Sequence, residues 1–370
     1  MATFTQEDRT ALTDALRHLL GDHGTEAHVR RAMETPRGYD PTLWRRLAEM
    51  GVVGLVVDEN HGGGGGGPVE LERVMEEAGA ALLCGPLLSS GVLAASLIQS
   101  LDDQDAKTRL LPAIADGARI ATVALTGEAG GWTPETVSVS AEQGDGGWTL
   151  SGVSSFVTHG QLADTLLVAA RANGGIAVFE VDAGAAGMTV TALPAFDHTL
   201  RLARIAFGAT PARALADGRP AWDAVERALD ITRVALAGEQ AGGARRVLEM
   251  TVDYAKARVQ FGRPIGGFQA IKHMAADLLL ESESAISAAR HAAQAMADCA
   301  PDAAASISLA AFACADAFNA VAAASIQMHG GIAFTWAHPA HLYLRRARAD
   351  AQLFGTPSFY RERYLRQLGA

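Results

Sequence analysis

The chain has little cysteine, the residue from which dithiol redox centres and many metal sites are built. Three cysteines are present in 370 residues, at Cys84, Cys299 and Cys314. They lie far apart and form no CxxC spacing, which argues against a metal site or a dithiol redox pair. Because free cysteines prefer protein interiors, we expect three buried, unreactive thiols.

Basic charge and long apolar runs are also scarce. The 31 Lys and Arg residues against 41 Asp and Glu residues give a net charge of -10. No basic field attracts a polyanion, so we expect no nucleic-acid partner. The first ten residues lack the pattern of a secretory signal, and no uninterrupted apolar run approaches the ~20 residues of a membrane span. We therefore expect a soluble, cytoplasmic protein without a membrane span.

Hydrophobic residues are abundant, at 49%, and a chain of this length is expected to form two or three domains. Residues 1–118 show apolar residues at helical spacing, which predicts an N-terminal helical domain. The helices that we expect there cover residues 6–20, 41–50, 69–81, 89–100 and 105–115.

The pattern changes twice after residue 118. Residues 119–215 contain short β-type runs without intervening helices, which predicts an antiparallel β domain. Its expected strands cover residues 120–125, 136–140, 148–150, 165–168, 176–179 and 188–191. Residues 216–370 return to long Ala-rich helices, expected at 222–258, 268–298, 302–329 and 337–354, which favour a four-helix bundle. The fold class is therefore α+β and mostly α.

Six consecutive glycines, Gly62–Gly67, satisfy the spacing GxGxxG. A dinucleotide-binding fingerprint also needs a βαβ unit and an acidic residue about 20 positions further on. Residues 85–90 contain no acid. We therefore expect a flexible surface loop here.

Two segments at the ends of expected helices combine a cation, amides and bare backbone. In the first, a helix ends near Gly262, and Arg258 can hold a phosphate pair bidentately or interact with the helix dipole. In the second, Gln327 precedes Gly330 and Gly331. These glycines can cap a helix or let a ligand approach the backbone.

The string formed by residues 254–270 and the Gln-x-x-Gly-Gly of residues 327–331 resemble the flavin-binding signatures of the acyl-CoA dehydrogenase family. The resemblance covers nearly the whole chain and extends to its helical, β and four-helix order. It implies that Arg258, Gln260 and Phe261 reach the flavin adenine dinucleotide (FAD) of a neighbouring subunit. It further implies that Gln327, Gly330 and Gly331 contact the adenosine diphosphate half of the cofactor.

Two segments of the β region look like the family's flavin-ring segments. The resemblance implies that the hydroxyls of Thr126 and Thr158 contact the edge of the ring, and that Phe156 packs on it in place of the usual Trp. The alternative is that these hydroxyls only satisfy backbone groups. The residues that follow Thr126 depart from the family's pattern up to Trp132.

Asp230 and Arg233 lie on one face of the first bundle helix by i, i+3 spacing. The resemblance places this Arg at the coenzyme A end of the substrate pocket. A surface ion pair is the alternative.

The family removes the α-proton of an acyl thioester with a buried carboxylate. Its two usual positions are occupied here by Gly355 and Thr232, so both carboxylates are missing. Glu239 follows Thr232 by seven residues and falls on the same helix face, flanked by Ala and Gly. It is the best remaining base, unless it is a structural hydrogen-bond partner; Asp230 is a weaker choice.

The resemblance implies α,β-desaturation of an acyl-CoA, with electrons passed to an electron-transferring flavoprotein. Gly355 can still offer its backbone N–H to the thioester oxygen. The chain is expected to form a homotetramer, or a heterotetramer with a second acyl-CoA dehydrogenase-like chain, as in actinobacterial enzymes for bulky substrates such as steroid side chains. Alternatives are a non-catalytic subunit that completes its partner's FAD site, or a flavin oxidase or monooxygenase on the same fold.

Overall fold

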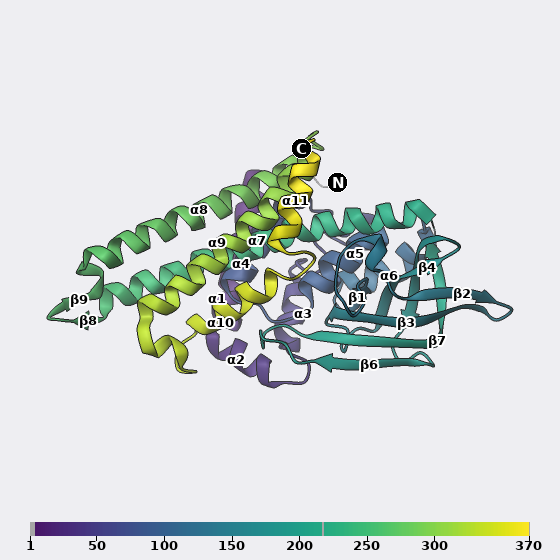
Figure 1. Ribbon diagram of the computed structural model, residues 1–370, viewed down its shortest axis with the longest axis horizontal. Helices are drawn as coiled ribbons and strands as arrows, with labels where there is room; N and C mark the ends of the chain where they lie inside the picture. Colours follow the sequence, from purple (N-terminus) through teal and green to yellow (C-terminus); the bar gives the residue numbers. More distant parts are fainter. Residues whose placement is uncertain (1–3, 217, 370) are drawn as a thin grey trace. The chain divides into compact units, whose positions relative to one another are not determined.

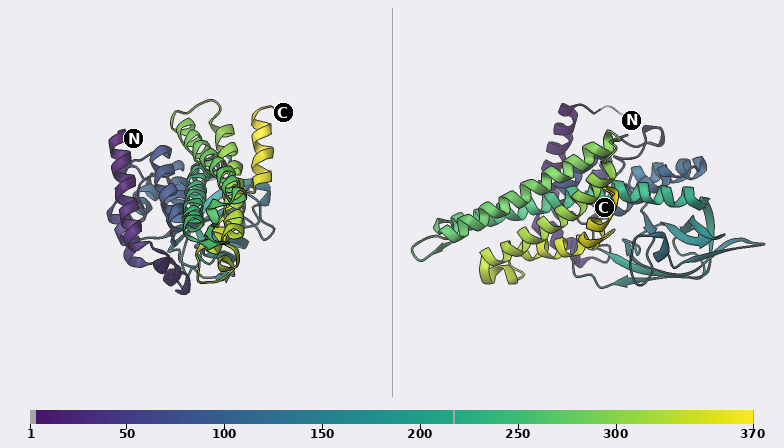
Figure 2. Two further views of the ribbon diagram at one scale, coloured as in Figure 1. Left: turned by 90° about the vertical axis from the view of Figure 1, so that its left-hand side faces the viewer. Right: turned by 45° about the horizontal axis from the view of Figure 1, so that its top comes forward.

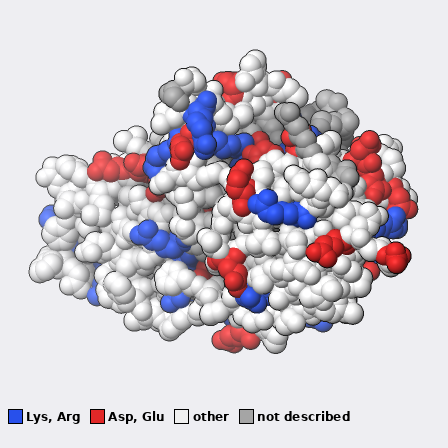
Figure 3. Space-filling model, turned by 45° about the vertical axis from the view of Figure 1, so that its right-hand side comes forward, with Lys and Arg blue, Asp and Glu red and all other residues white. Residues whose placement is uncertain are grey.

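The computed structural model describes residues 4–216 and 218–369 (Figure 1). The chain divides into two compact units. Of the described residues, unit 1 contains those of 32–67 and 84–232, and unit 2 contains those of 4–31, 68–83 and 233–369. The expected fold class is confirmed, because helices precede and follow a central sheet. On the face shown in Figure 3, charged side chains of both signs are interspersed among uncharged ones.

Short helices accompany the sheet in unit 1. They are α3 (Pro41–Glu49), the π-helix η2 (Leu87–Ala94), α5 (Ala95–Ser100) and α6 (Gln104–Ala115). Asp40 caps α3 by accepting from the backbone N–H of Thr42 (2.7 Å). The segment expected as one α-helix over residues 89–100 begins as the π-helix η2 and continues as α5.

The six-glycine run is held by backbone contacts and is not a free surface loop. Backbone N–H groups of Gly64, Gly65 and Gly66 donate to carbonyl oxygens of residues 54–57 at 2.8 to 3.0 Å. A Cβ at Gly63 would overlap the carbonyl oxygen of Val57. The close approach of two backbones thus explains a glycine at that position.

Seven strands form the sheet of unit 1. They are β1 (Ala121–Ala124), β2 (Ser140–Gly144), β3 (Gly147–Thr158), β4 (Thr165–Ala172), β5 (Gly175–Asp182), β6 (Met188–Leu193) and β7 (Leu202–Ala216). The pairings close a ring in the order β4, β2, β3, β7, β5 and back to β4, with β1 on β4 and β6 on β7. The pairs are antiparallel except those of β4 with β1 and β2. Strand β7 has no counterpart among the expected strands.

Long helices form unit 2. They are α1 (Gln6–His23), α2 (Glu26–Glu34, with its last residues in unit 1), α4 (Pro68–Ala80), the C-terminal part of α7 (Gly218–Ala257), α8 (Gln269–Ala297), α9 (Ala303–His329), α10 (Ala340–Asp350) and α11 (Pro357–Gln367). Helices α7, α8 and α9 run side by side (Figures 1 and 2). Their shared core is built mainly from alanine, and small side chains let helix axes approach closely.

The last expected helix, over residues 337–354, is shorter than expected, and a further helix that was not expected, α11, follows it. Helix α10 ends at Asp350, and Phe354 (φ 58°) and Gly355 (φ 136°) then take positive φ values that no helix continues. Thr356 caps α11 by accepting from the backbone N–H of Phe359 (3.2 Å).

Helix α9 lies at the centre of unit 2. Residues 303–334 are the one stretch in the described ranges that is long and apolar enough to cross a membrane, and an 18-residue window within it has a mean hydropathy of 1.6. The helix packs against α8, α10 and α11, so its apolarity also suits a core helix of a bundle. Cys314 on this helix is buried, as is Cys84, but Cys299 is exposed. The expectation of three buried thiols is therefore wrong for Cys299.

Glycines bring α4 and α7 into backbone contact. A Cβ at Gly238 would lie 2.6 Å from the carbonyl oxygen of Glu72, and one at Gly242 would overlap the carbonyl oxygen of Glu76. A Cβ at Gly79 of α4 would in turn overlap a backbone carbonyl of α7. The Ala- and Gly-rich stretch of α7 therefore serves the crossing of two helices.

Helix α4 carries four buried glutamates, which the sequence patterns did not reveal. Three of them are paired with arginines of α1, α7 and α8: Glu70 with Arg9 (2.6 Å), Glu76 with Arg245 (3.3 Å) and Arg290 (3.0 Å), and Glu77 with Arg17 (2.9 Å) and Arg245 (3.1 Å). Paired charges offset part of the cost of their burial.

The fourth, Glu72, is only 1% exposed. Its Oε2 lies 3.7 Å from Nε of Arg73, while its Oε1 has no hydrogen-bond partner among the described residues. Burial, with the negative charge of Glu76, raises the pKa of Glu72 to about 7 against the opposing charges of Arg73 and Arg290.

We expect Gly242→Ala to lower the free energy of unfolding by about 1–3 kcal/mol, the usual range for an overpacked core. The added methyl group meets backbone of α4, which cannot rotate away. The matched control is Gly21→Ala in α1, where nothing lies within 4 Å of the new Cβ. That change should stabilise the helix by about 0.5–1 kcal/mol. Urea unfolding of both variants measures these changes in the free energy of unfolding. Equal changes in the two variants would refute the backbone contact of α4 and α7 at Gly242.

We expect Glu72 to make the protein less stable as pH rises. In the folded protein Glu72 keeps its proton up to pH about 7, whereas in the unfolded chain it ionises above its ordinary pKa of 4.5. The free energy of unfolding should therefore fall between about pH 4.5 and pH 7, by roughly 3 kcal/mol, and level off above that window. The isosteric Glu72→Gln should flatten this dependence and be the more stable protein at pH 8. Parallel unfolding curves across this pH range would contradict the prediction.

Candidate functional site

The two flavin-ring segments expected in unit 1 are tied together by hydrogen bonds. The hydroxyl of Thr126, just after β1, donates to the carbonyl oxygen of Ser155 (2.5 Å). In return, the carbonyl oxygen of Thr126 accepts from the hydroxyl of Ser154 and from the backbone N–H of Ser155, both at 2.9 Å. The Thr126 hydroxyl thus satisfies a backbone group and keeps lone pairs as an acceptor.

Phe156, at a bulge in β3, is exposed, whereas Thr158 is buried. The register of β3 against β7 shifts between Ser154 and Val157, and Phe156 takes a left-handed φ of 58°. Its ring is 42% exposed, whereas Thr158 is only 4% exposed. The Thr158 hydroxyl makes no hydrogen bond within the described part of the chain. An outward aromatic ring and an unused hydroxyl are therefore close in sequence and available to a ligand.

In unit 2, a tight hairpin follows α7. Its strands are β8 (Val259–Gln260) and β9 (Arg263–Pro264). Phe261 and Gly262 at the tip have φ values of 51° and 77°, as a two-residue hairpin turn requires. Phe261 is 92% exposed and touches Phe268 edge to face.

Arg258 lies just before this hairpin and Gln260 lies in its first strand; both are exposed. The backbone of Arg258 is fixed, because its N–H donates to Tyr254 and its carbonyl oxygen accepts from Ile265, each at 2.8 Å. Its guanidinium makes no ion pair with any described residue. A fixed backbone with an uncommitted guanidinium suits the bidentate grip of a phosphate group.

The Gln-Gly-Gly segment lies at the end of α9. Gln327 is exposed, and Gly330 has φ 66° and ψ −148°, a conformation open almost only to glycine. A Cβ at Gly331 would meet nothing within 4 Å, so the chain itself does not explain that glycine. The rings of Tyr254 and His329 are 4.5 Å apart, which joins the end of α7 to the end of α9.

The expected substrate residues on α7 differ in burial. Asp230 is half-buried, whereas Arg233 is only 2% exposed. Arg233 lies against Tyr360 of α11, with its guanidinium 5.6 Å from the ring centre and its Nε donating to the hydroxyl (3.4 Å). Arg233 is therefore buried inside unit 2 and does not lie at the surface.

Tyr360 also occupies the space beside Gly355, where the resemblance places a carboxylate. A Cβ at Gly355 would lie 2.7 Å from Cζ of Tyr360, whose hydroxyl donates to the carbonyl oxygen of Phe354. The cavity that Arg233, Gly355 and Tyr360 line has a volume of only about 10 Å³. The contact of the Gly355 N–H with a thioester stays a prediction.

Glu239 forms a buried ion pair. It is 7% exposed, and Nη1 of Arg346 on α10, itself 5% exposed, donates to its carboxylate. Nη2 of Arg346 also donates to the carbonyl oxygen of Leu83 (3.3 Å). At the other usual position of the base, the Thr232 hydroxyl donates to Ala228 in its own helix (2.7 Å). The role of Glu239 as a base stays a prediction, but this pairing supports the structural alternative.

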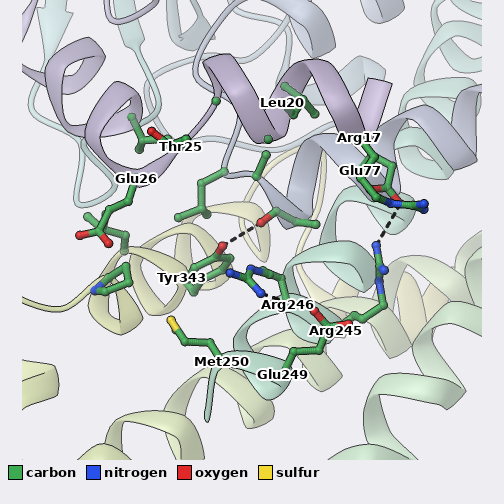
Figure 4. A pocket seen from close by; sticks show the side chains of 18 residues that line it. Arg17, Leu20, Thr25, Glu26, Glu77, Arg245, Arg246, Glu249, Met250 and Tyr343 are labelled. Carbon is green, nitrogen blue, oxygen red and sulfur yellow. Dashed lines mark hydrogen bonds and ion pairs between the residues drawn. The ribbon is translucent and has the colours of Figure 1, made fainter. Parts of the chain in front are cut away.

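Unit 2 also contains a cavity of about 460 Å³ that the sequence did not reveal (Figure 4). Its walls come from α1, α2, α4, α7 and α10. Arg17 and Arg245 both pair with Glu77 on its wall. Burial raises the pKa of Tyr343 to about 12, and its hydroxyl donates to the carbonyl oxygen of Ala80 (2.7 Å).

Sequence comparisons cover both ends and nearly all of the chain. Residues 6–118 match the N-terminal domain of acyl-CoA dehydrogenases, and residues 222–369 match their C-terminal domain. The acyl-CoA dehydrogenase IpdE2 of Mycolicibacterium smegmatis is 35% identical over 352 residues, which are 95% of this chain and 96% of that protein. The protein of the same name from Mycobacterium tuberculosis is 34% identical over 353 residues, which are 95% and 94% of the two chains.

Solved structures agree with the sequence matches. A variant of the Tcur3481-Tcur3483 steroid ACAD has a TM-score of 0.89 and 31% identity, with 98% of each chain covered. The ChsE4-ChsE5 complex from Mycobacterium tuberculosis has a TM-score of 0.90 and 29% identity, covering 100% of this chain and 99% of the other. An FAD complex of PigA shares the fold, with a TM-score of 0.91 at 21% identity over 100% and 99% of the chains. The chain therefore belongs to the acyl-CoA dehydrogenase family.

Proposed function

We propose that this chain is a subunit of an FAD-dependent enzyme that introduces an α,β double bond into an acyl-CoA thioester. In this proposal, a second acyl-CoA dehydrogenase-like chain supplies the catalytic base. The proposal rests on the contacts of the three residues at which a catalytic base is expected. Gly355 is packed against Tyr360, Thr232 is hydrogen-bonded within its own helix, and Glu239 is paired with Arg346.

An ion pair makes Glu239 a poor base. A base must take up a proton, and protonation of Glu239 would cost it the ion pair with Arg346. Breaking the pair would leave a buried, unpaired charge. The chemistry is better served by a carboxylate from another chain.

The residues of each unit fit a bound FAD. In unit 1, the exposed ring of Phe156 and the unused hydroxyl of Thr158 offer a stacking surface and a hydrogen bond. In unit 2, Arg258 offers a cation and Gly331 an open backbone toward the diphosphate of a cofactor held by a neighbouring subunit. When bound, FAD supplies the acceptor for the β-hydride of the substrate.

The relatives support a two-chain assembly and a bulky substrate. Tcur3481-Tcur3483 and ChsE4-ChsE5 are both named as pairs of chains, and the first is named as a steroid enzyme. We therefore propose a heterotetramer that acts on the CoA ester of a bulky acyl group such as a steroid side chain. The electron acceptor that the family resemblance implies is an electron-transferring flavoprotein.

We expect Arg258→Ala to weaken FAD binding by about 10- to 100-fold, the usual cost of losing a hydrogen bond to a charged group. The control is Lys256→Ala, which removes the same charge two residues earlier. Lys256 lies only 3.8 Å from Asp253 at the surface, so its loss should leave the flavin bound. The visible absorption of each variant after gel filtration measures the retained flavin. Equal retention in both variants would exclude Arg258 from the cofactor site.

We expect Glu239→Gln to lower the free energy of unfolding by about 3–5 kcal/mol without slowing chemistry. The chain should be co-purified with a candidate partner that carries the family's carboxylate, and an acyl-CoA added. The rate at which the bound flavin loses its visible absorption should match the wild type, whereas the chain alone should show no such loss. The double variant Glu239→Gln/Arg346→Met should regain part of the stability. A variant that retains flavin but no longer reacts would identify Glu239 as the base.

A further inference from the structure

A buried serine and a buried histidine meet inside unit 1. Oγ of Ser89 lies 2.9 Å from Nδ1 of His159 and 3.3 Å from the carbonyl oxygen of Pro86. The two residues are 0% and 4% exposed and lie 70 positions apart in the chain. The hydroxyl of Ser89 donates to the carbonyl oxygen of Pro86, and the tautomer of His159 sets which atom donates in the bond between Ser89 and Nδ1.

His159 is held in a strained conformation directly after Thr158. Its φ of 54° is uncommon outside glycine, and such a residue persists only when its surroundings fix it. Its backbone N–H donates to Arg201 (2.8 Å), and its carbonyl oxygen accepts from Leu162 (2.9 Å). The bond to Ser89 adds a side-chain anchor to these backbone anchors.

Ser89 sits in the π-helix η2. Such helices are rare, and they occur frequently at functional sites. The next residue, Ser90, accepts from the backbone N–H of Ala121 in β1 (3.0 Å). Ser90 thus links the π-helix to the sheet by a hydrogen bond, and Ser89 contacts His159.

The contacts that Thr158 itself makes hold its backbone within strand β3. Its carbonyl oxygen accepts from the hydroxyl of Thr122 (2.6 Å), and its strand position is paired with Leu202. The chain direction beyond it depends on the left-handed turn at His159. Relaxation of that turn would tilt Thr158 and redirect its hydroxyl.

We propose that Ser89 is a positioning residue that acts through His159 to aim the Thr158 hydroxyl at the flavin. This role rests on the proposed function, since it presumes that Thr158 contacts the ring. It relates the π-helix and the strained histidine to the position of Thr158. Neither Ser89 nor His159 touches the cofactor in this proposal.

The test compares flavin affinity and the flavin absorption spectrum in the complete enzyme, with its partner chain present. Ser89→Ala should weaken FAD binding about tenfold, as expected for one buried hydrogen bond, and should shift the absorption bands. His159→Ala should do the same. Because Ser89 and His159 act through the same hydrogen bond, the double variant should bind FAD no more weakly than the weaker-binding single variant.

The control is Ser90→Ala, which removes a buried hydrogen bond from the same helix without affecting His159. It should lower the unfolding temperature as Ser89→Ala does but leave the spectrum unchanged. Ser89→Cys, which keeps the size of the side chain, should give an intermediate affinity and serves if the Ala variant does not fold.

The outcomes separate the two proposals. A wild-type protein without flavin, even with its partner, overturns both. A flavin-loaded wild type whose Ser89 and His159 variants keep its affinity and spectrum overturns only the positioning role. Equal spectral shifts in the Ser89 and Ser90 variants also overturn it, because they would reflect a loosened helix.

Discussion

The backbone-to-backbone crossing of α4 and α7 is the constraint on which unit 2 depends. Gly79, Gly238 and Gly242 allow it, because any larger side chain there would meet a carbonyl group of the other helix. The crossing carries the glutamates of α4 into the interior, where arginines from three other helices meet them. It also encloses Glu239, which leaves Arg346 as its counter-charge. One steric requirement thus sets much of the buried electrostatics.

The parts of the site that depend on local sequence were predictable. Gly262 shapes the hairpin tip that exposes Phe261, and Gly330 adopts the conformation that glycine alone tolerates. Neighbours in the chain decide both features. The same holds for the order of helices and strands, because the hydrophobic period changes where the fold changes.

The parts that depend on distant residues were not predictable. Glu239 and Arg346 are 107 positions apart, and no pattern in one sequence links them. The small residues around Glu239 suggested a buried base, yet Gly238 and Gly242 are required because the backbone of α4 passes close to them. Likewise, helix α11 was not expected from the sequence, and only the fold reveals that its Tyr360 packs against Gly355.

The packing of Tyr360 against Gly355 has an evolutionary consequence. A glutamate introduced at that position alone would collide with the tyrosine ring, and removal of the ring alone would leave a gap with no new chemistry. A carboxylate can therefore be restored at this position only if Gly355 and Tyr360 change together.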